Sequence, residues 1–252
     1  AQLKIDIAKA RDRGERINAL RKSDLELQSA DPEYATRAGS NNVHFLLPLT
    51  NISIEIEEYL YQCLSPETEL NAIGIYMWYH SRALLKVLKI NSGNFTAEER
   101  SKIILSALAD EAFALHFLQD VFAAGHVAGT RGDASQRKGT HDYYNEMGLK
   151  VSTWEGEPMV LTGDAWMREQ DSEKAAVAIR LSLEQFLDVA ANKIKLVIQL
   201  KDFDLYAPED YNVCMNNYMP AIKTGTEFVE SLVSIVLKTP IPGLAQGLGE
   251  FP

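Results

Sequence analysis

The sequence predicts an all-α fold, a single-domain multi-helix bundle of about seven helices. Apolar residues recur at helical spacing through most of the chain, and helix-capping patterns separate the segments. Only residues 150–163 are irregular enough to hold a short strand pair. Long helices joined by long loops favour an antiparallel bundle, whose core can house polar ligands from facing helices. We expect the domain to span 1–238 and the Pro- and Gly-rich segment 239–252 to be a tail or linker.

The first third of the chain contains two helical segments and one ambiguous one. Residues 1–29 are charged and helical in pattern, and 31–42 are typical of a loop. Residues 52–64 fit either a strand or a helix, and we favour a helix because the neighbouring segments are helical. The run Ser65-Pro66-Glu67 has an N-cap, a proline at the first helical position and an acid in the first turn, so it predicts a helix that runs to Lys89.

The central stretch contains the clearest helix signal. Thr96 and Glu99 have the spacing of a capping box, and apolar residues then recur at helical spacing, which predicts one helix over 97–124 with Gly125 as its stop. Residues 127–139 are typical of a solvated loop. A short helix should follow from an N-cap at Thr140 to a stop at Gly148.

The last third should add two more helices. Ser172 predicts the start of a helix that ends near Leu200, and Thr226 the start of one that ends near Lys238. Trp154 and Trp166, in the irregular region between, are interpreted as packing groups.

Composition limits the classes of function. The 252 residues are 46% hydrophobic and 24% charged, as in an ordinary globular protein with a sizeable core. A net charge of −10 argues against nonspecific nucleic-acid binding. No apolar run approaches the ~20 residues of a membrane span. Cys63 and Cys214 are interpreted as buried free thiols or, alternatively, as one long-range disulfide.

Three of the five histidines cluster in the central stretch. His116 and Asp120 are four residues apart, so they project from one face of the predicted helix. An imidazole and a carboxylate at that spacing can bind one divalent metal at about 2 Å for each ligand atom. His126 follows the helix, and His141 opens the next one. His44 lies in a loop and is interpreted as a structural histidine that remains a candidate ligand.

The order H-x3-D-x5-H, a loop, then H-x3 and an acid or amide resembles the core of the zinc-dependent phospholipase C and P1/S1 nuclease superfamily. The resemblance covers His116, Asp120, His126 and His141. It implies an all-helical, secreted hydrolase of phosphate esters with a zinc cluster. It also implies a histidine ligand from an earlier helix, for which His80 is the counterpart.

The chain departs from the family pattern at three places. Asn145 takes the position of the last acidic ligand, with Glu146 one residue later. Residue 1 is Ala1 where the family uses a tryptophan for its third zinc. The acid upstream of the second histidine has no counterpart nearer than Glu67 and Glu69. The predicted site therefore holds one or two zinc ions.

The resulting ligand set and catalytic set overlap. The predicted metal ligands are His80, His116, Asp120, His126 and His141, with Asn145 or Glu146 as a weaker sixth. The catalytic candidates are Asp120 as a bridging carboxylate and Glu111 and Glu146 as base or supporting residues.

Two functions are expected from these observations. The first is a zinc-dependent phosphoesterase that acts on a phosphate-ester small molecule or a lipid headgroup, in the periplasm, in the cell envelope or after secretion. The second is a non-catalytic helical interaction domain of a larger envelope or secreted protein, with a structural metal or a degenerate site. An open coordination position would distinguish the first from the second, because a structural zinc is closed by four protein ligands.

Overall fold

The fold was determined as a computed structural model, which describes residues 9, 11–32, 42–66, 68–128, 141–194, 213, 219 and 226–243. Within these residues the chain is mostly helical, with one two-stranded sheet, so the all-α prediction is confirmed. None of the described helices is both long and apolar enough to cross a membrane.

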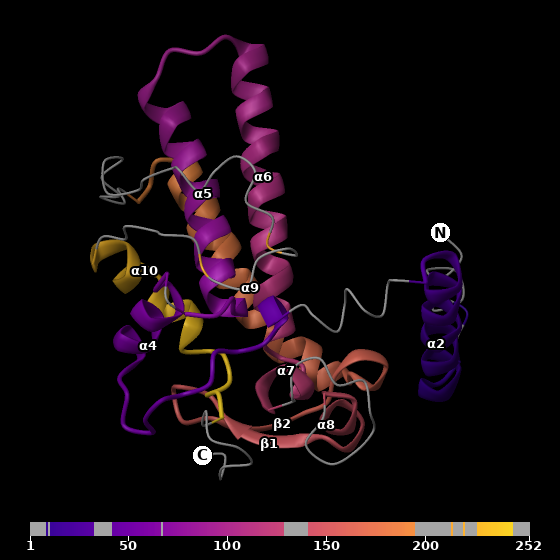
Figure 1. Cartoon of the computed structure of the whole chain (residues 1–252). Coiled ribbons are helices and arrows are strands. Elements are labelled where there is room, and N and C mark those ends of the chain that lie inside the picture. The colour runs from indigo at the N-terminus through magenta and orange to yellow at the C-terminus, as the bar shows by residue number, and fades with distance from the viewer. Residues whose placement is uncertain are drawn as a thin grey trace.

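Three long helices form the centre of the bundle. They are α5 (Ala72–Ser92), α6 (Ala97–Asp120) and α9 (Glu169–Ala190), which pack against one another (Figure 1). The helices α4 (Ile56–Cys63) and α10 (Thr226–Val236) pack at one side. Large side chains that are almost fully buried fill the space between these helices: Tyr59, Ile73, Tyr76, Phe117 and Leu118.

Helix α6 begins as predicted and ends earlier than predicted. Thr96 and Glu99 form the full capping box, each side chain bonding the other's backbone N–H. The helix stops at Asp120 in a turn, and a second short helix, α7 (Ala124–Ala128), then contains Gly125. Gly125 does not end a helix: a Cβ there would lie 2.5 Å from the carbonyl oxygen of His141, so this position allows α8 to approach closely.

Helix α5 begins later than the Ser65-Pro66-Glu67 pattern predicts. Its N-cap is Asn71, whose side-chain oxygen accepts from the backbone N–H of Gly74 at 2.7 Å. The same amide donates to the carbonyl of Cys63 at 3.0 Å, so Asn71 joins the end of α4 to the start of α5. That tertiary bond explains why Asn71, rather than Ser65, is the cap. The ambiguous segment 52–64 is helical only from Ile56.

A β-hairpin follows the short helix α8 (His141–Met147). Gly148, at φ +82°, ends α8 as predicted. Strands β1 (Leu149–Ser152) and β2 (Pro158–Leu161) then pair antiparallel, which confirms the predicted strand pair.

The segment expected to be a tail starts within the fold. Ile241 donates its backbone N–H to Ser152 at 2.9 Å, and Leu49 donates to the carbonyl of Gly243 at 2.8 Å. Thr239 and Pro240 are buried. The packed domain therefore extends at least to Gly243.

The remaining elements lie around this bundle. Helix α2 (Arg13–Ala30) starts at the N-cap Asp12 and contacts the 3-10 turn η2 (Asp164–Trp166), where the Arg21 guanidinium lies 5.3 Å from the Trp166 ring. The 3-10 turn η1 (Asn42–His44) precedes the core segment Phe45–Leu49. Helix α9 starts at Glu169 rather than Ser172 and ends at Ala190. Asn192 has φ +55° in the turn that follows, so the predicted continuation of the helix toward Leu200 is wrong.

The predictions for the two cysteines have different outcomes. Cys63 is a fully buried free thiol whose pKa burial raises strongly, despite a hydrogen bond with Tyr59. Cys214 and the N-cap prediction for Thr140 lie outside the described residues.

Candidate metal centre

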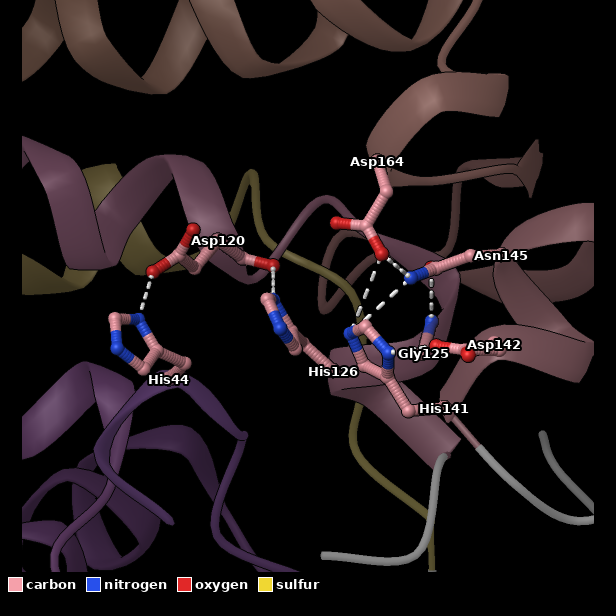
Figure 2. A network of polar contacts seen from close by, with 8 residues as sticks. All are labelled: His44, Asp120, Gly125, His126, His141, Asp142, Asn145 and Asp164. Atoms are coloured by element: carbon pink, nitrogen blue, oxygen red, sulfur yellow. Dashed lines mark hydrogen bonds and ion pairs between the residues drawn. The ribbon is translucent and has the colours of Figure 1, made fainter. Parts of the chain in front are cut away.

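Polar residues gather where α6 ends. The turn η1, the end of α6, helices α7 and α8, and η2 all meet at this end of the bundle (Figure 2). They bring together residues that are 120 positions apart in the chain, from His44 to Asp164 (164 − 44). Two groups of histidine and aspartate side chains could each hold a metal ion, because their ligand atoms lie within 4.8 Å of one another.

The first group, called here the His44 group, contains His44, His116 and Asp120. The Nδ1–H of His44 donates to Oδ2 of Asp120 at 2.5 Å, and Nε2 of His116 lies 3.5 Å from the same oxygen. Two ligands of one tetrahedral zinc, each bound at about 2 Å, lie about 3.3 Å apart. His116 and Asp120 therefore have the separation of ligands that share an ion, while His44 hydrogen-bonds the carboxylate.

The second group, called here the His141 group, contains His141, Asp142 and Asp164. Nδ1 of His141 lies 2.9 Å from Oδ1 of Asp142, and Nε2 lies 3.6 Å from Oδ2 of Asp164. A carboxylate only accepts hydrogen bonds, so the Asp142 contact places the proton on Nδ1 and leaves the lone pair on Nε2. That lone pair faces Asp164, again at a separation close to that of two ligands of one ion.

His126 lies between the two groups (Figure 2). Its Nδ1–H donates to the main-chain carbonyl of Asp120 at 2.9 Å, which leaves its lone pair on Nε2. Its ring centroid is 4.9 Å from that of His141 and 6.0 Å from that of His44. Phe45 packs against both His126 and His141 and covers one side of this row of imidazoles.

Asn145 is buried and holds the elements of the second group together. Its Oδ1 accepts the backbone N–H of Gly125 at 2.6 Å, and its Nδ2 donates to Oδ2 of Asp164 at 2.6 Å and to Nε2 of His141 at 3.1 Å. These partners fix the orientation of the amide, with nitrogen toward the group and oxygen toward α7. The prediction that Asn145 is a metal ligand is therefore corrected, because its only ligand atom is turned away and occupied.

The two central histidines have pKa values shifted in opposite directions. Burial lowers the pKa of His126, against the opposing charge of Asp120. Burial also opposes protonation of His141, but the hydrogen bond to Asp142 and the charge of Asp164 outweigh it and raise its pKa. Neutral imidazole is the form that binds metal, so His126 is ready to bind at neutral pH and His141 releases a proton more reluctantly.

His80 and Glu111, two of the predicted site residues, lie elsewhere. His80 is fully buried in the core, with Nδ1 2.6 Å from Glu111 and Nε2 2.7 Å from Oε1 of Gln185. The Gln185 amide is oriented by its donation to Ser231, and Ser182 donates to Glu111 at 2.8 Å. Both His80 nitrogens are occupied by partners in the core, so neither faces a position where a metal could bind. We correct both assignments: these residues form a buried polar network between α5, α6 and α9.

Glu146 is also excluded from the site. It is exposed on α8, while its neighbour Asn145 is buried. This is the separation of about 100° between adjacent residues on a helix. The two groups thus contain the predicted His116, Asp120 and His141, with the predicted His126 between them, and they add His44, Asp142 and Asp164.

Of the three added residues, only His44 could be identified as a candidate from the sequence. His44 was a candidate from its loop position beside an apolar run. Asp164 follows the hairpin and has φ +47°, and no local pattern marks it as a ligand. Its position depends on Gly163, where a Cβ would lie 2.0 Å from Oδ1 of Asn145.

Comparison with models of known protein families, with curated proteins and with solved structures found no match. The interpretation of the site therefore depends on its own geometry and chemistry. Imidazole nitrogens and carboxylate oxygens, without thiolates, are the donors of catalytic zinc sites, and each group combines them. The side chains of His116 and Asp164 are 50% and 52% exposed, so solvent and small molecules reach both groups.

Proposed function

We propose that this protein is a metal-dependent phosphoesterase, with zinc as the metal, acting on phosphodiester or phospholipid-type substrates. One observation carries the proposal: two solvent-accessible groups of imidazole and carboxylate lie at the end of α6, with His126 between them and bonded to the main chain of Asp120. A bound divalent cation would act as a Lewis acid toward a phosphoryl oxygen and lower the pKa of water to about 7.

The residues of the chain have separable roles in this proposal. Asp120 and His116 supply ligand atoms, and His44 holds the Asp120 carboxylate by its Nδ1–H. With its proton on Nε2 instead, His44 would offer Nδ1 as a third ligand to the same group. The exposure of the groups favours catalysis over a structural site, because a structural zinc is enclosed by four protein ligands. The net charge of −10 is no obstacle, since bound cations would supply the positive charge that a phosphate needs.

The spacing of His116, Asp120, His126 and His141 supports the further proposal that the bundle has the phospholipase C and P1 nuclease type of fold. By that resemblance we also propose a location in the periplasm, in the cell envelope or outside the cell. The resemblance implies a sixth ligand at position 145, but the side-chain oxygen of Asn145 points away from the site and accepts a hydrogen bond from Gly125.

The test is hydrolysis of a chromogenic phosphodiester and of phosphatidylcholine, with added zinc and with chelator. We expect turnover that needs the metal and that Asp120→Asn and His116→Ala abolish. Asp188→Asn, which removes a carboxylate from an exposed ion pair with Lys193, is the matched control and should leave turnover unchanged. Full metal loading without turnover on either substrate would contradict the proposal and favour the non-catalytic interaction domain.

A further inference from the structure

We propose that Asp164 supplies the carboxylate ligand of a second cation, which it binds together with His141 and His126, and that Asn145 positions Asp164 without binding the metal itself. This inference goes beyond the proposed reaction, because it assigns a metal site that can be present or absent independently of the His44 group. It rests on the proposed function only in the choice of zinc as the cation.

The hydrogen bonds at Nδ1 leave the lone pair of both imidazoles on Nε2. Asp142 accepts from Nδ1 of His141, and the carbonyl of Asp120 accepts from Nδ1 of His126. Metal-binding histidines almost always have such a partner, which fixes the tautomer and the ring orientation. The Nε2 atom of His141 accepts a hydrogen bond from Nδ2 of Asn145 at 3.1 Å, which a bound cation would replace.

The position of Asp164 matches that of a ligand. Its Oδ2 lies 3.6 Å from Nε2 of His141, against about 3.3 Å for two ligands at about 2 Å from a tetrahedral zinc. In the His44 group, Nε2 of His116 lies 3.5 Å from Oδ2 of Asp120, so the two pairs of ligand atoms have nearly the same separation. His126, whose ring centroid lies 4.9 Å from that of His141, would complete the site by turning toward the ion. Two imidazoles and one carboxylate, with one open position, form a common catalytic zinc set.

The backbone at Asp164 supports a specific role for this residue. Its φ of +47° lies in the left-handed region, which is uncommon for a residue other than glycine. The turn is maintained by Gly163, which bonds the carbonyl of Asn145 through its N–H at 3.2 Å. Such strain concentrates at functional sites, and here it directs a half-exposed carboxylate toward an imidazole lone pair.

Asn145 has the opposite character, that of a positioning residue. Its amide oxygen is occupied by Gly125, and its nitrogen donates to the same Oδ2 atom that faces His141. An amide donor between a carboxylate and an imidazole holds both without adding a charge. The family pattern has its carboxylate at position 145, whereas in this chain Asp164 supplies the carboxylate of the site.

The experiment is a zinc and cobalt titration of the metal-free protein, with bound equivalents measured after desalting. Wild type should bind two equivalents. Asp164→Asn should bind one, with affinity for the second lowered by more than about 100-fold, the upper end of what loss of an outer partner costs. Asn tolerates a positive φ, so this variant should fold. Glu146→Gln removes an exposed carboxylate from the same helix as His141, outside both groups, so it should bind two equivalents.

The exchange variant Asn145→Asp/Asp164→Asn gives a second, independent test. It preserves the hydrogen bond between the two side chains and the acceptor for Gly125, and it returns a carboxylate to the site. We expect it to regain the second equivalent, and the cobalt absorption spectrum should again report two bound ions. A purely structural role for Asp164 would not predict this rescue.

The results separate this inference from the proposed function. Two equivalents of unchanged affinity in Asp164→Asn, or loss of the second ion in Glu146→Gln alone, would overturn the assignment of Asp164. One equivalent in wild type, removed by Asp120→Asn and accompanied by turnover, would overturn it while the phosphoesterase proposal stands. Two equivalents without turnover would support the site and contradict the enzyme.

Discussion

His126 hydrogen-bonds the main-chain carbonyl of Asp120, at 2.9 Å, and not its carboxylate. This bond uses a carbonyl that α6 leaves without an intrahelical partner at its end. It leaves the Asp120 carboxylate for His44 and His116. Asp120 thereby belongs to the His44 group through its side chain and orients His126 through its backbone.

The first prediction concerns His80. His80→Ala should lower the free energy of unfolding by about 3–5 kcal/mol, because it leaves the Glu111 carboxylate buried without its partner. The number of bound metal equivalents should not change, since His80 lies outside both groups. Chemical denaturation and metal analysis on the same sample measure the two effects.

Glu98→Gln is the matched control on the same helix, because Glu98 makes only an exposed pair with Lys102. Its effect should stay within about 0.5 kcal/mol. A His80→Ala protein that unfolds like wild type but loses a metal equivalent would return His80 to the ligand set.

The second prediction concerns Gly163. Its backbone is extended, with φ −152°, a conformation that any residue can adopt. An added Cβ, however, would lie 2.0 Å from Oδ1 of Asn145. Gly163→Ala should therefore lower the free energy of unfolding by about 1–3 kcal/mol through overpacking. It should also weaken binding of the second cation, because it displaces Asn145. Thermal unfolding with and without zinc measures both.

Gly156→Ala separates sterics from backbone strain. Gly156 has φ +83° and no atom within 4 Å of its Cβ position, so only the conformational cost of about 1 kcal/mol applies. Zinc should stabilise this variant as much as wild type. An equal loss of zinc stabilisation in both variants would contradict the role given to Asn145.

The third prediction is a pH dependence of stability. Burial opposes ionisation of Asp171, but hydrogen bonds from Arg168 and Thr162 outweigh it and hold its pKa below the ordinary 3.8. Because the folded-state pKa is the lower one, its contribution is complete above pH 3.8 and is lost as the pH falls through the folded pKa. Asp171→Asn should cost about 1.5–3 kcal/mol at pH 6, as for a hydrogen bond to a charged group.

The measurement is urea unfolding of wild type and Asp171→Asn from pH 6 down to the acid transition. The difference between the two proteins should shrink only below pH 3.8. A difference that stays constant through that range would mean that folding does not lower the pKa of Asp171.

The fourth prediction concerns Asn145→Asp. Without metal, this change places two carboxylates 2.6 Å apart at positions 145 and 164 and removes the donor between them, so the metal-free protein should be less stable than wild type. With metal, the added charge should tighten binding of the second cation. Zinc should therefore raise the melting temperature of the variant more than that of wild type. An equal rise in the two proteins would argue that no cation lies at this position.

Local signals in the sequence predict the start of α6, the end of α8 and the hairpin correctly. The capping box of Thr96 and Glu99 and the stop at Gly148 depend only on neighbouring residues. The start of α5 could not be predicted in this way, because Asn71 is chosen as the cap by its bond to Cys63. A pattern such as Ser65-Pro66-Glu67 has no information about that tertiary partner.

The site shows the same division. His116 and Asp120 are brought together by helical spacing alone, so their relationship follows from the sequence. A hairpin and a left-handed turn bring Asp164 next to His141. No sequence pattern indicates where the Asp164 side chain points after that turn. His80 has the position of a ligand in the sequence pattern but lies 31 residues from Glu111, a buried partner that the pattern does not include.

The two groups differ in the length of chain that they close. His44 and Asp120 are separated by 76 residues, whereas His141 and Asp164 are separated by 23 (164 − 141). The entropy lost on closing a flexible loop grows by about 0.6 kcal/mol for each doubling of its length. The roughly threefold difference corresponds to about 1 kcal/mol. An ion that bound His44 together with Asp120 would therefore act as the more effective cross-link of the unfolded chain, in the manner of a long-range disulfide, while the His141 group can assemble within one local stretch.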